Sequence, residues 1–62
     1  MDLFSYQFEN QEDRELAFLN IAKWYGDSFI ERVETLELTI RPPADLQVAT
    51  QEIAEKHLGR LK

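Results

Sequence analysis

Side chains that could carry out nucleophilic or acid–base chemistry are scarce in this sequence of 62 residues. The only histidine is His57, the only serines are Ser5 and Ser28, and there is no cysteine. A nucleophile needs a neighbouring base and a group that orients that base. Ser28 is explained by a role as a helix cap, and Ser5 falls in a predicted strand. The sequence therefore supports no catalytic triad, and we expect a protein that is not an enzyme.

His57 also lacks the neighbours that a metal site on a helix requires. A second ligand would have to lie three or four residues away, and those positions hold Ile53, Ala54, Arg60 and Leu61. We therefore expect His57 to lie at the edge of the core or near a helix end, with no bound metal.

Carboxylates are numerous, and twelve of the 62 side chains are acidic. A group of four precedes or begins a predicted helix: Glu9, Glu12, Asp13 and Glu15. Negative charge at this place stabilises the positive end of the helix dipole. The group lacks the Asp/Asn and Gly spacing of a calcium loop, and no Gly-rich phosphate loop is present. We expect no cofactor.

Composition and charge limit the class of protein. The length allows a single domain over residues 1–62, and the apolar content of 44% is too high for disorder. The net charge of −5 disfavours direct binding to nucleic acid, and no apolar stretch is long enough to cross a membrane. The absence of cysteine fits a cytoplasmic protein.

Two elements are predicted in the first half of the chain. Phe4, Tyr6 and Phe8 alternate with polar residues, which is typical of a half-buried strand at about residues 2–9. Asn10 is a favourable N-cap for a helix that should end at Gly26.

The predicted helix carries more apolar residues than one buried face needs. They occupy most of its circumference, and only Asn20 and Lys23 form a polar stripe. Two interpretations remain open: the helix is the centre of a small core, or part of its apolar surface is an interface with another chain.

Residues 28–41 fit two structures. Ser28 and Glu31 form a capping-box pattern, whereas Leu36, Leu38 and Ile40 alternate with polar residues as in a strand. We expect a helical turn at about residues 28–32 followed by a strand at about 33–41, which ends at two prolines.

A second, amphipathic helix is predicted after Pro43 and should stop near Gly59. The predicted fold is therefore α+β, a small β-α-β-α domain in which two helices cover a short sheet. Two adjacent strands joined by a helix would be parallel, and such a small sheet would need completion by dimerisation. A three-helix bundle, with residues 28–40 helical, is the alternative.

The sequence favours a small protein–protein interaction module, a homodimeric adaptor or a regulator of a larger protein. The candidate partner-binding residues combine large aromatic rings and acidic side chains of the first helix: Trp24, Tyr25, Phe18, Glu12 and Glu15. One alternative is an acidic inhibitor that mimics nucleic-acid charge and blocks a nucleic-acid-binding protein. A further alternative is an enzyme whose pocket forms only between two subunits.

Overall fold

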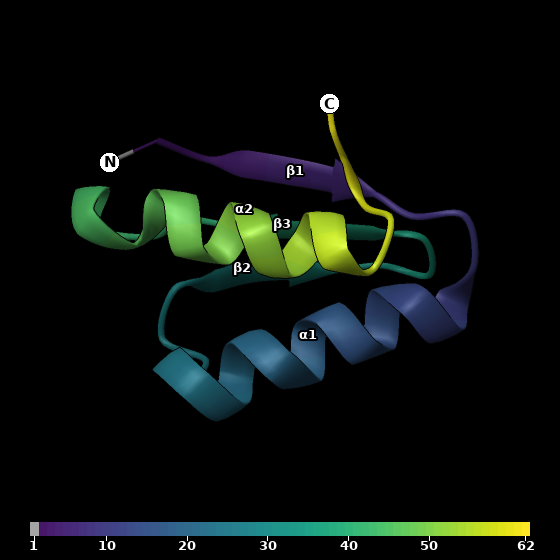
Figure 1. The fold of residues 1–62 in the computed structure, drawn as a ribbon, viewed down its shortest axis with the longest axis horizontal. Helices are drawn as coiled ribbons and strands as arrows, with labels where there is room; N and C mark the ends of the chain where they lie inside the picture. Colours follow the sequence, from purple (N-terminus) through teal and green to yellow (C-terminus); the bar gives the residue numbers. More distant parts are fainter. Residues whose placement is uncertain (1) are drawn as a thin grey trace.

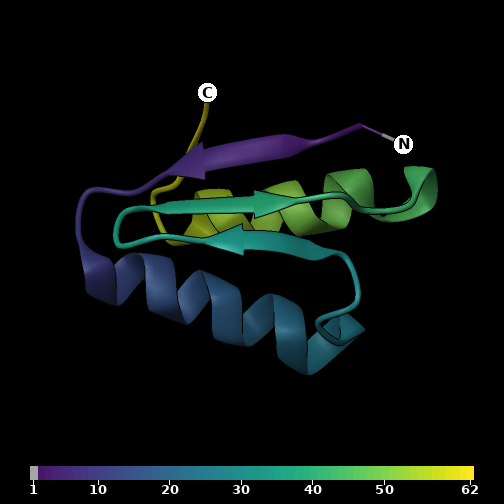
Figure 2. The same cartoon turned by 180° about the vertical axis from the view of Figure 1, so that it is seen from behind.

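A computed structural model describes residues 2–62 of the chain as one sheet with two helices on the same face (Figures 1 and 2). The elements are β1 (Phe4–Gln7), α1 (Gln11–Tyr25), β2 (Ile30–Val33), β3 (Glu37–Ile40), a 3-10 turn (Ala44–Leu46), α2 (Gln47–Lys56) and β4 (Arg60–Leu61). The strand order is β2-β3-β1-β4, and every pair is antiparallel. This is the split-βαβ arrangement also found in ferredoxin-like domains.

The α+β fold class predicted from the sequence is confirmed, and the three-helix alternative is not supported. The strand that follows α1 does not pair with β1, because β3 lies between them and runs antiparallel to β1. The expected parallel pairing is therefore wrong. The sheet also has four strands within one chain rather than two, so a second copy is not needed to complete it.

Residues 30–40 form a hairpin, where the sequence predicted a helical turn and one long strand. The alternation of Leu36, Leu38 and Ile40 with polar residues begins inside the turn at residues 34–36, so it does not mark the break between β2 and β3. The backbone N–H of Glu34 donates to the carbonyl of Glu37 at 2.8 Å and closes the hairpin. A bulge between Ile30 and Arg32 shifts the register of β2.

Helix α1 begins and ends where the sequence predicts. The side chain of Asn10 accepts a hydrogen bond from the backbone N–H of Asp13 at 2.9 Å. Gly26 adopts φ +77°, and its N–H donates to the carbonyl of Ala22 at 2.8 Å. A left-handed residue at this place favours glycine, so the stop signal in the sequence has a direct structural cause.

The end of α2 is a Schellman turn that leads into β4, a strand that the sequence did not indicate. Leu58 and Gly59 donate to the carbonyls of Glu55 and Ala54 at 2.9 and 2.8 Å. Leu58, rather than the glycine, adopts the left-handed conformation, with φ 67°. The chain then pairs with β1 through only two residues, Arg60 and Leu61.

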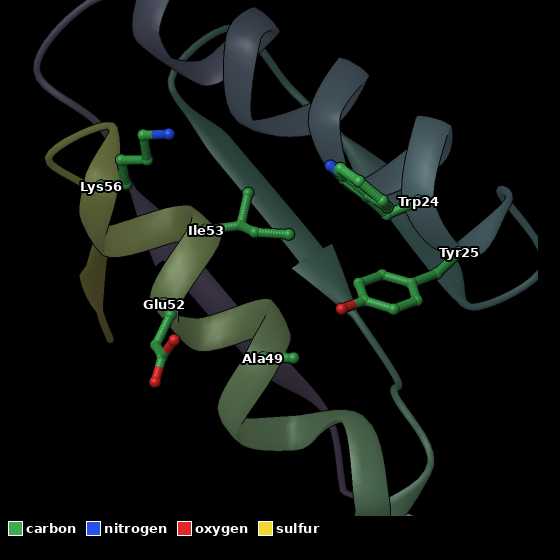
Figure 3. A pocket seen from close by; sticks show the side chains of 6 residues that line it. All are labelled: Trp24, Tyr25, Ala49, Glu52, Ile53 and Lys56. Carbon is green, nitrogen blue, oxygen red and sulfur yellow. The ribbon is translucent and has the colours of Figure 1, made fainter.

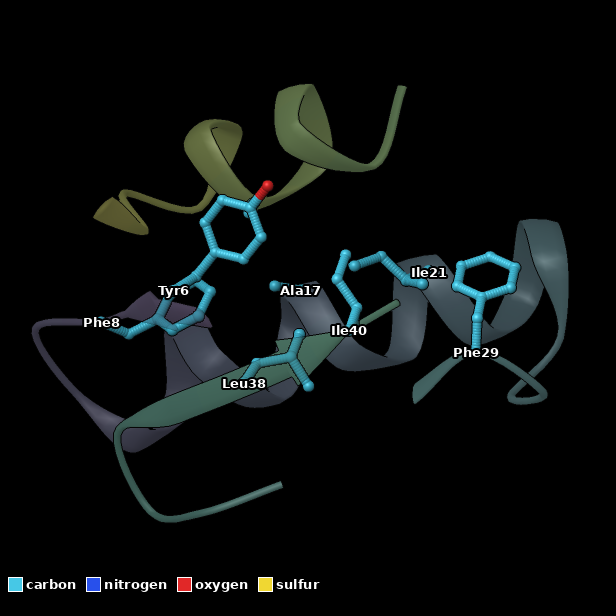
Figure 4. Packing of buried hydrophobic residues seen from close by; sticks show 8 residues of the cluster. Tyr6, Phe8, Ala17, Ile21, Phe29, Leu38 and Ile40 are labelled. Carbon is cyan, nitrogen blue, oxygen red and sulfur yellow. The ribbon is translucent and has the colours of Figure 1, made fainter. Parts of the chain in front are cut away.

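The core lies between the sheet and the two helices (Figure 4). It consists of eight buried apolar residues from both layers: Tyr6, Phe8, Ala17, Ile21, Phe29, Leu38, Ile40 and Ala54. Arg14 is also buried, and its Nε donates to the carbonyl of Thr35 at 3.3 Å, which ties α1 to the hairpin. Within residues 2–62, neither helix has the length and apolar character needed to cross a bilayer.

Candidate functional site

The candidate site is a groove between the two helices, with a volume of about 410 Å³ (Figure 3). Six residues line it: Trp24, Tyr25, Ala49, Glu52, Ile53 and Lys56. A hollow of about 560 Å³ also lies at the β2–β3 hairpin, but polar side chains form most of its wall. Binding sites are lined mainly by apolar and aromatic groups, so the groove between the helices is the better candidate.

The last turn of α1 supplies the aromatic wall of the groove. Consecutive helical residues point about 100° apart, so Trp24 and Tyr25 take different roles. The Tyr25 ring is half-buried and lies 6.1 Å from the Phe29 ring, in a tilted arrangement. The side chain of Trp24 leaves the core, and the residue is 69% exposed.

Helix α2 supplies the opposite wall. Ala49 and Ile53 are one turn apart, and Ile53 also packs against the core. Glu52 and Lys56 are exposed and are also four residues apart. Glu52 therefore follows Ala49 by three residues, and Lys56 follows Ile53 by three residues. The groove therefore combines apolar walls with one negative and one positive side chain, which are groups that orient a bound partner.

A hydrogen bond between the helices holds this geometry. The side-chain amide of Asn20 donates to Nε2 of His57 at 2.8 Å. Asn20 lies one turn before Trp24, and His57 lies one turn after Ile53. The bond therefore joins α1 and α2 one helical turn away from Trp24 and Ile53. His57 is the residue that follows α2, as expected for a histidine near a helix end.

The five predicted partner-binding residues do not all lie at the groove. Trp24 and Tyr25 line it together, as described above. Phe18 is half-buried and packs against the core. Glu12 is exposed in the first turn of α1, and Glu15 forms an ion pair with Arg14. The binding role of all five residues stays a prediction.

Sequence reasoning identified the aromatic wall but not its partner wall. Ala49 and Ile53 belong to the amphipathic helix predicted after Pro43, and the sequence gives them no role beyond its apolar face. Glu52 and Lys56 flank Ile53 in the sequence, but nothing local indicates that these residues line a groove with Trp24. Their common position at the groove depends on the antiparallel placement of the helices on one sheet face (Figure 1).

The polar side chains considered for catalysis have other partners. The hydroxyl of Ser5 lies 2.9 Å from the hydroxyl of Thr39, on neighbouring strands. His57 is bonded to Asn20, as described above, and Ser28 is exposed in the turn before β2. Among residues 2–62, no three His, Asp or Glu side chains lie close enough together to hold a metal ion.

No family model, no curated protein and no solved structure matches this chain in the comparisons. The geometry of the groove and the net charge of −5 are therefore the observations that bear on function.

Proposed function

We propose that this chain is a non-catalytic protein–protein interaction domain of the cytoplasm, a homodimeric adaptor or a regulator of a larger protein. The observation that carries the proposal is the position of Trp24, which is 69% exposed beside an apolar groove between two helices. The partner is a protein segment that places an apolar side chain between Trp24 and Ile53 and charged groups near Glu52 and Lys56.

Physical chemistry supports a binding role for this tryptophan. An indole ring in water exposes a large apolar surface, whose removal from water is favourable. Tryptophan is enriched among residues whose truncation weakens protein interfaces by about 2 kcal/mol or more. Because Tyr25 and Phe29 already fill the adjacent part of the core, Trp24 is available for a contact outside the chain.

The non-catalytic part of the proposal rests on how the polar side chains are engaged. His57 lies at the end of α2 and holds the two helices together through Asn20. Ser5 is on β1 and contributes to a hydroxyl pair between strands. Both residues therefore have structural roles in different parts of the domain.

A capture experiment with a matched control tests the proposal. The tagged protein, a Trp24→Ala variant and a Val48→Ala variant are each incubated with extract of the source cell. Val48 is the matched control, because it is 67% exposed on α2 but does not line the groove. All three proteins should give the same circular dichroism spectrum, which shows that they are folded.

We expect one partner to be retained by the wild type and by Val48→Ala, and to be lost with Trp24→Ala. The expected loss of affinity is at least about thirtyfold, which corresponds to roughly 2 kcal/mol. Equal retention by all three proteins would show that the groove is not the binding site.

A second candidate function, the acidic inhibitor, is favoured by the net charge of −5. The two helices and the 3-10 turn carry six carboxylates and three basic side chains. Ion pairs join the basic side chains of the strands and their ends to carboxylates: Arg32–Glu34, Arg41–Glu31, Arg60–Glu9 and Lys62–Glu37. The other residues of the chain carry six carboxylates and four basic side chains, so negative charge is in excess on both parts of the domain, which suits a basic target.

The two functions differ in their response to salt. Binding through the Trp24 groove should change little between low and moderate ionic strength, because its main term is apolar. Binding by charge mimicry should weaken by at least about tenfold over the same range. The affinity of the captured partner, measured at both salt concentrations, distinguishes them.

A further inference from the structure

Helix α1 carries an outer stripe of four exposed residues: Glu12, Leu16, Leu19 and Lys23. Their spacing of four, three and four residues places them within about 60° of one another around the helix. The buried side chains of α1 are Arg14, Ala17 and Ile21, which point the other way. The outer stripe is therefore not part of the core of this chain.

The centre of the outer stripe is apolar although it faces solvent. Leu16 is 42% exposed and Leu19 is 51% exposed. Apolar residues that repeat at alternating spacings of three and four form the contact between paired helices. The outer stripe thus has the pattern of a short helix–helix contact for which the chain itself supplies no second helix.

Two copies of the outer stripe are complementary to each other when they run in opposite directions. If α1 packs antiparallel on α1 of a second copy, with the twofold axis between residues 17 and 18, Leu16 faces the other copy's Leu19. In the same register, Glu12 faces the other copy's Lys23, and both contacts occur twice because of the symmetry. Apolar contacts lie at the centre and opposite charges at both ends.

The flanking residues fit the same register. Along the helix axis, Asp13 lies level with the other copy's Ala22, and Glu15 lies level with its Asn20, so no carboxylate of α1 lies level with another carboxylate. A parallel pairing would place Glu12, Asp13 and Glu15 against their own copies, with repulsion between like charges. The charge pattern therefore selects the antiparallel arrangement.

We infer that the outer stripe of α1 is the contact surface between two copies of this chain, paired antiparallel about a twofold axis. The inference deepens the homodimer of the proposed function and rests on that part of it, but it does not depend on the Trp24 groove. It also replaces the sheet edges as the expected contact. Edge strand β2 has a bulge and exposed charges, and edge strand β4 has two residues, which are features that discourage pairing between sheets.

The proposed contact between the two α1 helices is small, so we expect the affinity of the dimer to be low. A helix of 15 residues is about 22 Å long, so two such helices bury less surface than a standard stable interface. We expect a reversible dimer that is populated at concentrations of roughly 0.1 to 1 mM and is largely dissociated at low micromolar concentration.

Sedimentation equilibrium over this concentration range tests the inference. The wild type should approach the mass of two chains at the highest concentration. A Leu16→Gln/Leu19→Gln variant should remain at the mass of one chain while it stays folded, because both leucines are already half exposed. Trp24→Ala should dimerise like the wild type, since the groove lies on another face of α1.

Charge reversal tests the register. Glu12→Lys and Lys23→Glu, each alone, should weaken dimerisation by about tenfold, and the double variant should restore it. An equimolar mixture of the two single variants should form mixed dimers, in which every facing pair has opposite charges. Glu52→Lys is the matched control, because it makes the same change of charge on α2 and should leave the dimer unchanged.

Several results would overturn the inference. The first is a wild type that stays at the mass of one chain at 1 mM, which is about the upper limit of the expected range. The others are a dimer that still forms in the double leucine variant and a dimer whose affinity is unchanged by Glu12→Lys. A dimer lost with Trp24→Ala would assign the contact to the groove instead. Failure of the capture experiment alone would leave the outer stripe unaffected.

Discussion

Gly59 lies at a position that has no room for a side chain. A Cβ atom at this position would lie 2.6 Å from Cε2 of Phe8 and 2.9 Å from the carbonyl oxygen of Ala54. Phe8 is in the core, and the carbonyl is part of the turn that ends α2. We expect Gly59→Ala to lower the free energy of unfolding by about 1–3 kcal/mol, as measured by urea denaturation. An unchanged midpoint would contradict this.

Leu58 provides the matched control for that experiment. It adopts φ 67°, a conformation that costs a non-glycine residue about 1 kcal/mol, and its side chain is 63% exposed. Leu58→Gly should therefore raise the free energy of unfolding by up to about 1 kcal/mol. The two neighbouring substitutions change stability in opposite directions if the turn is as described.

Tyr6 makes stability depend on pH in the alkaline range. Burial, and to a lesser degree the negative charge of Glu55, raise the pKa of its phenol above 10.0. Above pH 10 the unfolded chain loses this proton before the folded chain does, so the folded state binds more protons and stability falls as pH rises. Tyr6→Phe should flatten this fall, as measured by chemical denaturation between pH 9 and about pH 11. Identical slopes for the two proteins would be inconsistent with a buried phenol.

At the scale of the element, α1 has three different faces. One face packs on the sheet, one carries Trp24 beside α2, and the third is the outer stripe. The apolar excess noticed in the sequence is therefore divided between the core and the two exposed faces. The sequence alone could not show which apolar residues of α1 are buried and which are exposed, because this depends on where β2 and α2 lie.

The exposure of Trp24 leads to a prediction about stability. Trp24→Ala should lower the free energy of unfolding by less than about 1 kcal/mol, since substitutions at exposed positions have small effects. A tryptophan in the core would instead cost about 3–5 kcal/mol, which is about the full stability expected of so small a domain. Thermal or urea denaturation of the variant separates the two cases, and a large loss would contradict the exposed position.

The limits of sequence reasoning are clearest in the hairpin and in β4. Strong local signals, such as Asn10 before α1 and Gly26 after it, gave the correct helix ends. The hairpin was missed because its turn at residues 34–36 has no Gly, Pro, Asn or Asp to mark it. Strand β4 was missed because two residues carry no periodicity, and its pairing with β1 is a contact distant in sequence.

For the whole molecule, the antiparallel sheet changes the basis of the functional argument. The sequence indicated that unpaired strands would need a second copy, but β2 pairs with β3 and β4 pairs with β1 within one chain. What remains exposed is apolar surface on the helix layer, at Trp24 and at the outer stripe. The candidate site could be predicted only in part, because its two walls come from helices that are separated by the whole hairpin.

Negative charge is in excess both on the helix layer and on the rest of the domain. The helices and the 3-10 turn carry six carboxylates and three basic side chains, and the other residues carry six carboxylates and four basic side chains that are joined to carboxylates in ion pairs. Partners of the helix layer should therefore be neutral or basic outside their apolar contact. In the proposed homodimer, the antiparallel register would meet the same requirement by placing Lys23 against Glu12.

Fluorescence quenching of Trp24, the only tryptophan in the chain, tests the central claim most directly. In the purified protein at low micromolar concentration, the indole should emit as it does in water and should be quenched readily by acrylamide, because its side chain is exposed. With the captured partner at saturation, the emission should shift to shorter wavelength and quenching should fall by at least about half. An indole that is shielded in the free protein, or one that stays equally accessible in the complex, would contradict a binding role for the groove.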